Sequence, residues 1–489
     1  MSFKISSFSL GCYITILKRK VRIIIRYQYD ESIQRGNDRG RRDTDPFAHA
    51  GDVKLSSDAI ALDVTQKGQD DVVKEVKPSL FAVLLEKFIP HGGLWSCALN
   101  LASATLGAGI CSLPTGFNLS GIVMSCIYLV CVAVGTVYSL NLLAKVAVKT
   151  GSRNYGEAAR MVMGPLTGYY AAALMIAMCF GGNVAYIIII GIILKAVLNR
   201  DGVPEYLKSE SGNRLMTSMV WLVIILPMCI PKQVNSLRHL SFVGVMFIVY
   251  FSCVVIGHSI NKIINEGVAD DIVYMRTGNS ALDGLSLFLF SFICQSNAFE
   301  IFREMKHRSP QRFTIYGTVG MSICAVLYFL VGLFGYLEFG GKSVDTVLSL
   351  YDPGENVAVA IAYIGVAIKI TVAHALHAIP IRDGLYHCVG WHVDTVPYWK
   401  HVVVVVTINF TSLIIGLFIP KASTVFGLVG AFCGGHIGLV LPPLFYMYSG
   451  GFTREKVGNI DFFGTYLLLF VGVVAVVFGT VSTIYNTVP

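Results

Sequence analysis

The sequence has 489 residues and a formal net charge of +8; 54% of its residues are hydrophobic and only 14% are charged. Soluble domains usually carry about 25% charged residues, and so few charges cannot cover the surface of a water-soluble fold. Composition therefore excludes an ordinary soluble protein and predicts a membrane protein.

Residues 1–85 differ in composition from the rest of the chain. They are basic after Lys18 and become acidic and polar up to Glu75. This profile predicts a disordered cytosolic tail. The apolar stretch before Lys18 is short and lacks a small-residue cleavage site, so a cleaved signal peptide is not expected. A basic contact with the membrane surface and a start codon upstream of the one normally used, which would leave residues 1–40 untranslated, both stay open.

The rest of the chain consists of long apolar runs, each sufficient for one or two membrane spans of about 20 residues. Eleven helices are predicted between residues 90 and 487, which we interpret as one transmembrane transporter domain. The runs are continuous rather than alternating, which excludes a β-barrel. The runs are 88–144 (two spans), 166–194, 215–231, 240–256, 284–299, 313–337, 356–381, 402–420, 422–452 and 462–489.

The distribution of positive charge predicts the orientation. If the N-terminus is cytosolic, the inner loops hold fourteen Lys and Arg residues and the outer loops hold eight. Basic residues favour the cytosolic side. The bias predicts an N-terminus inside and a C-terminus outside, which agrees with an odd number of helices.

Two of the predicted helices carry signs of an interruption. The first contains Gly107-Ala108-Gly109 and is followed by Pro114, and the sixth is short and contains Gln295-Ser296-Asn297. Interrupted segments at matching places in two halves of a chain indicate an inverted-repeat transporter. Close helix packing through small residues is the alternative explanation.

The same segments carry a resemblance to a known family. Four segments resemble, in the same order, motifs of the amino acid/auxin permease family: 103–114, 154–159, 290–304 and 379–382. Their residues are most similar in character to those of kinetoplastid members. The likeness covers about residues 90–485. It implies an all-α polytopic membrane protein with a LeuT-like 5+5 inverted repeat plus one extra helix, and amino-acid transport by alternating access.

A broken helix presents free N–H groups at one half-helix start and free C=O groups at the other half's end. A zwitterionic amino acid suits that pair of poles. We expect the carboxylate near the glycines of the first helix and the ammonium near the sixth, although interhelical hydrogen bonding is the alternative role for the side chains. The predicted substrate-binding residues are Thr105, Gly107, Ala108, Gly109, Cys294, Gln295, Ser296, Asn297 and Glu300.

A lysine within the eighth helix suggests how transport is coupled, because charge at bilayer depth is costly and usually functional. The resemblance implies that the first and eighth helices ligate sodium in sodium-coupled members, but the usual asparagine is Ser103 here. We hypothesise sodium-independent transport in which Lys369, beside Thr371, supplies the positive charge. A structural pair or a snorkelling lysine is the alternative.

Three further ionisable residues lie in or near spans. Glu300, where many relatives have proline, favours a cationic, lysine- or arginine-like substrate, or else pairs with Lys369 or Arg303. His374 and His377 lie three residues apart on one helix face. His374 is a candidate for proton coupling, and hydrogen bonding within the bundle is the alternative for both histidines.

The sequence contains no P-loop, HExxH or dinucleotide motif, so we expect no enzyme, no catalytic residue, no cofactor and no metal site. The twelve cysteines form no CxxC pair and are interpreted as apolar packing residues. We expect an amino acid as substrate, the lipid bilayer as surroundings and no nucleic-acid partner.

The overall interpretation is a secondary amino-acid transporter, sodium-independent, with proton coupling or facilitated exchange as the alternatives, located in the plasma membrane. The rival interpretation is an amino-acid-sensing receptor of the same fold with little net transport. The long charged tail is the sequence feature that favours this rival.

Overall fold

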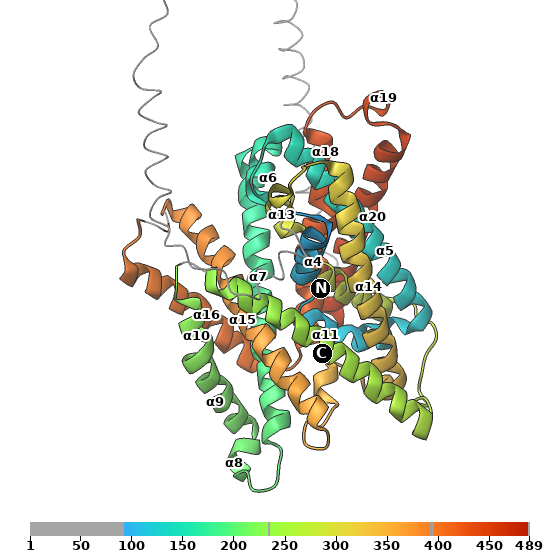
Figure 1. Ribbon diagram of the computed structural model, residues 1–489, viewed down its shortest axis with the longest axis vertical. Coiled ribbons are helices and arrows are strands. Elements are labelled where there is room, and N and C mark those ends of the chain that lie inside the picture. Colours follow the sequence, from blue (N-terminus) through green and yellow to red (C-terminus); the bar gives the residue numbers. More distant parts are fainter. Residues whose placement is uncertain (1–91, 233–234, 392, 394, 488–489) are drawn as a thin grey trace, which may run out of the picture. The chain divides into compact units, whose positions relative to one another are not determined.

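The computed structural model describes residues 92–232, 235–391, 393 and 395–487. The predicted cytosolic tail, residues 1–85, lies outside this part of the chain. Within it, all regular secondary structure is helical (Figure 1), as the uninterrupted apolar runs predicted.

The long helices are those expected to cross the bilayer, and several shorter helices connect or interrupt them. In chain order they are α4 (Leu94–Thr105), η3 (Ala108–Ser112), α5 (Leu113–Thr150), α6 (Tyr155–Met163), α7 (Pro165–Leu198), α8 (Glu205–Lys208), α9 (Glu210–Val220), η4 (Trp221–Ile225), α10 (Leu226–Cys229), α11 (Asn235–Glu266), α12 (Asn279–Ser291), η5 (Gln295–Asn297), α13 (Ala298–Glu304), α14 (Pro310–Phe339), η6 (Gly340–Lys342), η7 (Val347–Ser349), α15 (Val357–Val389), α16 (Tyr398–Phe418), α17 (Ala422–Val429), η8 (Gly430–Gly434), η9 (His436–Val440), α18 (Leu441–Tyr448), α19 (Arg454–Val457) and α20 (Asn459–Thr487).

Ten helical runs in the described residues are long and apolar enough to cross a membrane, against eleven predicted. The first of them, Ala108–Thr150, has 43 residues. As a straight helix it would be about 64 Å long, roughly twice the hydrocarbon core. It is divided at Gly121, whose φ of 76° and ψ of 165° are not helical. The first predicted span therefore consists of α4, η3 and the beginning of α5, and the second is the rest of α5.

The break at Gly121 is sealed by the segment between α11 and α12. The first two N–H groups after Gly121 donate to the carbonyl oxygens of Val273 and Tyr274 at 3.3 and 2.9 Å. In return, the N–H of Arg276 donates to Ser120 O at 2.9 Å. The helix start after Gly121 thus finds partners for donors that have none within the helix.

The predicted outer loops meet on one face of the transmembrane unit. The loop formed by residues 343–356, which follows α14, docks there on the beginning of α5. The Thr115 hydroxyl donates to Asp345 O at 2.6 Å, and the Asn118 amide donates to Ser343 O at 2.9 Å. The Asp345 carboxylate accepts the N–H of Ser423 at the start of α17 (2.9 Å), while burial raises the pKa of this carboxyl group.

The predicted inner loops meet on the opposite face. Lys145 near the end of α5 pairs with Asp461 at the start of α20 at 2.6 Å. Lys232 donates to the carbonyl oxygens of Val393 and Val396, which precede α16, at 2.9 and 2.8 Å. The chain therefore alternates between two faces as the charge distribution predicted, and which face is cytosolic stays a prediction.

The helices in contact with lipid carry apolar side chains on their outer surfaces. A bilayer tolerates such exposure, whereas water would not. On α20, for example, the large exposed side chains include Phe463, Leu467, Phe470, Val474, Phe478 and Val481. The apolar surface of α20 is consistent with a polytopic membrane protein.

We predict that Gly121→Ala destabilises the folded protein. A Cβ at this position would lie 2.8 Å from the backbone of Met275, in a conformation that side chains rarely adopt; such strain costs about 1–3 kcal/mol. The measurement is the thermal unfolding midpoint of detergent-solubilised protein. Gly151→Ala is the control, because Gly151 also has a positive φ of 69° but has no atom within 4 Å of its Cβ position. Equal midpoints for the two variants would contradict the prediction.

Candidate functional site

The first span is broken, as its glycines predicted. Helix α4 ends at Thr105, and η3 begins at Ala108. Between them Leu106 and Gly107 have extended backbone conformations. A 3-10 helix bonds each N–H to a carbonyl three residues earlier, so the first N–H groups of η3 have no partner within it.

The sixth span is broken as well. Helix α12 ends at Ser291, η5 begins at Gln295, and α13 follows. The Cys294 carbonyl accepts the N–H of Asn297 at 3.0 Å, and the Cys294 N–H donates to the Gln295 side-chain oxygen at 3.0 Å. The break therefore spans residues 292–294, and the Gln295 side chain provides an acceptor for the last N–H group of this break.

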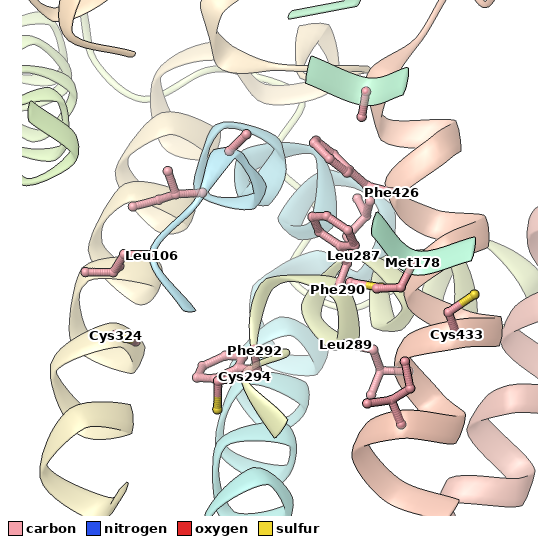
Figure 2. Close-up of a cluster of buried hydrophobic side chains, with 14 of the residues drawn as sticks. Leu106, Met178, Leu287, Leu289, Phe290, Phe292, Cys294, Cys324, Phe426 and Cys433 are labelled. Carbon is pink, nitrogen blue, oxygen red and sulfur yellow. The ribbon is translucent and has the colours of Figure 1, made fainter. Parts of the chain in front are cut away.

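The two breaks lie side by side, and one side chain joins them. The hydroxyl of Tyr328 on α14 lies 2.7 Å from Thr105 O and 2.9 Å from Ser291 O, which are the last residues of α4 and α12. One hydroxyl has one proton, so it donates to one of the two carbonyls at a time. Figure 2 shows Leu106, Phe292 and Cys294 in one buried cluster with Cys324 of α14. The structure thus confirms the two interruptions and places them together.

Two of the predicted glycines also contact neighbouring elements closely. A Cβ on Gly109 would meet the Ser291 hydroxyl at 2.8 Å, so this glycine allows η3 to pack against the end of α12. At Gly107, the nearest side-chain atom to a Cβ position is the hydroxyl of Tyr186 on α7, at 4.0 Å. Tyr186 therefore faces the break in the first span.

Two predicted side-chain contacts are already engaged within the protein. The Thr105 hydroxyl donates to Leu101 O, one turn earlier, at 2.9 Å. The Gln295 side chain is buried beside Gly438 of η9 and borders a cavity of about 10 Å³ that it shares with Thr136. Such a cavity is at most large enough for one water. These two residues shape the breaks, and their predicted contact with substrate stays a prediction.

The remaining predicted residues of the sixth span lie towards the surface. Ser296 is half-buried, and Asn297 and Glu300 are exposed. Glu300 forms no ion pair with Lys369 or Arg303, although all three residues are described. Glu300 is therefore accessible on α13 just beyond the break.

Lys369 lies inside the protein, midway along α15. Its side chain is 5% exposed and packs against Gly244 of α11, where a Cβ would lie 2.8 Å from its Cδ atom. Among the described residues, no carboxylate lies within ion-pair distance of it. His377 lies eight residues further along the same helix. The predicted coupling partners Ser103 and Thr371 are both half-buried.

A polar layer connects α15 with α7 and α16. His374 is fully buried, and its Nε2 atom lies 2.9 Å from the side-chain oxygen of Asn409 on α16. His377 lies against Tyr186, with ring centroids 5.3 Å apart. The amide of Asn183 on α7 is completely buried and has no hydrogen-bond partner among the described residues. His377 thus connects α15 through Tyr186 to the break at Gly107.

Tyr186, Tyr328 and Asn183 were not expected from the sequence. A tyrosine or asparagine within an apolar run has no spacing signal that separates a site residue from a packing residue. Asn409 stands in an Asn-Phe-Thr sequence inside an apolar run, and this pattern does not predict a partner for its side chain. Its hydrogen bond with His374 explains the buried polar side chain.

The architecture defines a polytopic helical membrane protein with two adjacent broken helices. Residues 90–485 match the family model described as transmembrane amino acid transporter protein. This chain belongs to that family, as the resemblance to the amino acid/auxin permeases predicted, and the family consists of transporters rather than enzymes.

Three relatives with known names cover most of the chain. The chain is 26% identical over 371 residues to vacuolar amino acid transporter 5 of Schizosaccharomyces pombe, covering 74% of this chain and 86% of the relative. It is 24% identical to amino acid transporter AVT6E of Arabidopsis thaliana, covering 81% and 83%. It is 26% identical to sodium-coupled neutral amino acid symporter 2 of Danio rerio, covering 76% and 78%.

We predict that Tyr328→Phe lowers transport about tenfold, because it removes the donor that the buried Thr105 and Ser291 carbonyls share, and an unsatisfied buried group costs about 1–3 kcal/mol. The measurement is uptake of radiolabelled amino acid, normalised to the amount of protein in the membrane. Tyr336→Phe is the matched control. Tyr336 lies on the same helix, is equally buried and accepts the N–H of Val273 away from the breaks. Unchanged uptake in Tyr328→Phe would show that the breaks do not need this hydroxyl.

Proposed function

We propose that this chain is a secondary transporter that moves amino acids across a membrane by alternating access, with the substrate bound between the two breaks. The observation that carries the proposal is the convergence of the ends of α4 and α12 on the Tyr328 hydroxyl. Helix N-termini attract a carboxylate and C-termini attract an ammonium. Broken helices of this kind form the substrate sites of transporters with inverted repeats, and we extend the LeuT-like 5+5 arrangement to this chain on that basis.

We further propose that transport does not require sodium. Ser103 stands where the family's sodium-dependent members have an asparagine. The side chain of Lys369 is buried and places an ammonium in the interior of the protein. A fixed positive charge at this depth repels a cation and so disfavours its binding nearby. One relative is named a sodium-coupled symporter, so sodium dependence is a direct test of this difference.

The proposed preference for cationic amino acids depends on Glu300. Its carboxylate is accessible on α13, directly beyond the break, and forms no ion pair with Lys369 or Arg303. An unpaired carboxylate on the path to the site attracts lysine- or arginine-like side chains. The plasma membrane is the proposed location, and the vacuolar naming of one relative makes an internal membrane the alternative.

The test of the proposed function is uptake of a panel of radiolabelled cationic and neutral amino acids in transport-deficient cells. The panel is measured with and without sodium, at two pH values. Saturable uptake that persists without sodium is the expected result. Strict sodium dependence would contradict the coupling proposal and leave transport intact. Binding without uptake, despite correct membrane insertion, would favour the receptor.

We predict that Lys369→Met reduces sodium-independent uptake to near background, because it removes the buried ammonium and keeps most of the side-chain volume. Lys421→Met is the control for the loss of one positive charge, since Lys421 is exposed in a predicted outer loop. Full sodium-independent uptake by Lys369→Met would overturn the coupling role. Uptake restored by sodium would support the idea that the ammonium replaces a cation.

We predict that Glu300→Gln raises the KM for lysine and arginine and leaves the KM for neutral amino acids unchanged. The variant removes the charge while preserving the shape of an exposed side chain. The same panel of substrates provides the measurement. Equal effects on cationic and neutral substrates would show that Glu300 does not select for charge.

A further inference from the structure

A second buried ionisable group lies far along α14 from the breaks. The side chain of Glu338, near the end of this helix on the predicted outer face, is completely buried. One carboxylate oxygen lies 3.0 Å from Nδ1 of His258 on α11. The other accepts hydrogen bonds from the hydroxyls of Ser259 (2.6 Å) and Tyr351 (2.9 Å). Such a set of donors holds a carboxylate away from water.

The groups around Glu338 come from three elements. Helix α11 supplies His258 and Ser259, together with Lys262, whose Nζ lies 3.9 Å from the same oxygen that His258 contacts. The loop 343–356 supplies Tyr351, whose ring packs edge-on against His258 with centroids 4.9 Å apart. Helix α14 also contributes Phe339, whose ring centroid lies 5.3 Å from Nζ of Lys262. The titratable neighbours are thus one histidine, one lysine and one tyrosine.

Tyr351 connects this cluster to the rest of the loop 343–356. Its carbonyl accepts the hydroxyl of Tyr363 on α15 at 3.0 Å, and that hydroxyl also donates to Leu348 O. Elsewhere the buried Asp345 carboxylate of the loop accepts the N–H of Ser423 at the start of α17. The loop is thus bonded to Glu338 and Tyr363 through Tyr351, and to α5 and α17 through Asp345.

The cluster extends from a buried carboxylate to the surface of the protein. The Glu338 side chain is 0% exposed, but the side chains of His258 and Lys262 are 33% and 35% exposed. Histidine is the side-chain type that exchanges protons between pH 5 and 8, and His258 is the histidine of this cluster.

We propose that Glu338 and His258 form a proton-binding site on the predicted outer face, occupied when the loop 343–356 is docked. This inference rests on the proposed transport function and names a site for its proton. Protonating His258 turns its hydrogen bond to the Glu338 carboxylate into an ion pair between two opposite charges, and this attraction is strongest where water is excluded. When the loop leaves, Tyr351 leaves with it and water reaches the carboxylate. Acid therefore favours the docked loop. By linkage, docking of the loop also raises the affinity of the site for the proton.

The primary experiment measures uptake between pH 5.5 and 8 for a substrate that the panel identifies. Three variants are compared: His258→Gln, which can still donate a hydrogen bond but does not titrate; Glu338→Gln, which keeps its shape and loses its charge; and Asp345→Asn, the control that removes the loop's other buried carboxyl group. We expect His258→Gln and Glu338→Gln to flatten the pH profile and Asp345→Asn to retain it. A wild-type profile in both cluster variants, or a flat profile in Asp345→Asn alone, would overturn the proposal.

A second measurement does not need transport. Hydrogen exchange of the amides in residues 343–356, corrected for the intrinsic pH dependence of exchange, reports loop docking in the purified full-length chain. We expect greater protection at pH 5.5 than at pH 7.5 in the wild type and equal protection at both values in His258→Gln. Uptake with no pH effect on protection would reject the proton site and keep the transporter. A pH effect on protection without any uptake would keep the proton site and reject the transporter.

Discussion

Inside a bilayer no water is available to bond with the backbone, so each N–H and C=O group needs a partner within the protein. This chain interrupts two spans under that constraint. The Tyr328 hydroxyl lies within hydrogen-bond distance of the last carbonyl of α4 and the last carbonyl of α12. Because both helix ends meet at one side chain, the two breaks are adjacent. The first N–H groups of η3, which have no partner within that helix, lie at the same place.

Helix α14 connects this centre with the predicted outer face. Tyr328 contacts the breaks, while Glu338, further along the same helix, binds α11 and the loop 343–356 through hydrogen bonds. A continuous helix transmits displacement along its axis, so movement at the breaks and docking of the loop involve the same rigid element. The same loop also bonds to the beginning of α5, which belongs to the broken first span.

The opposite side of the breaks is lined by a polar layer rather than by apolar packing. Tyr186 lies between Gly107 and His377, and Lys369 is buried on the same helix as His377. A buried ammonium without a nearby carboxylate is costly and is retained where it has a function.

The sequence by itself determined the class of the protein, the alternation of its loops and the location of both breaks. These features depend on local properties: the length of apolar runs, the side on which Lys and Arg accumulate, and glycines or polar residues that interrupt a run. The sequence count of eleven spans also anticipated the division at Gly121, because two spans fit between residues 88 and 144.

Only the tertiary structure decided which side chains meet. Tyr328 lies more than 200 residues from Thr105 in the chain. Glu338 follows directly after a long apolar run, and its partners His258, Ser259 and Tyr351 come from other elements. The Gln295 side chain packs beside Gly438 of η9, and Glu300 is exposed on α13 beyond the break. Such contacts depend on the rotation and packing of helices far apart in sequence. Neither hydropathy nor residue spacing encodes these properties, because each describes one segment at a time.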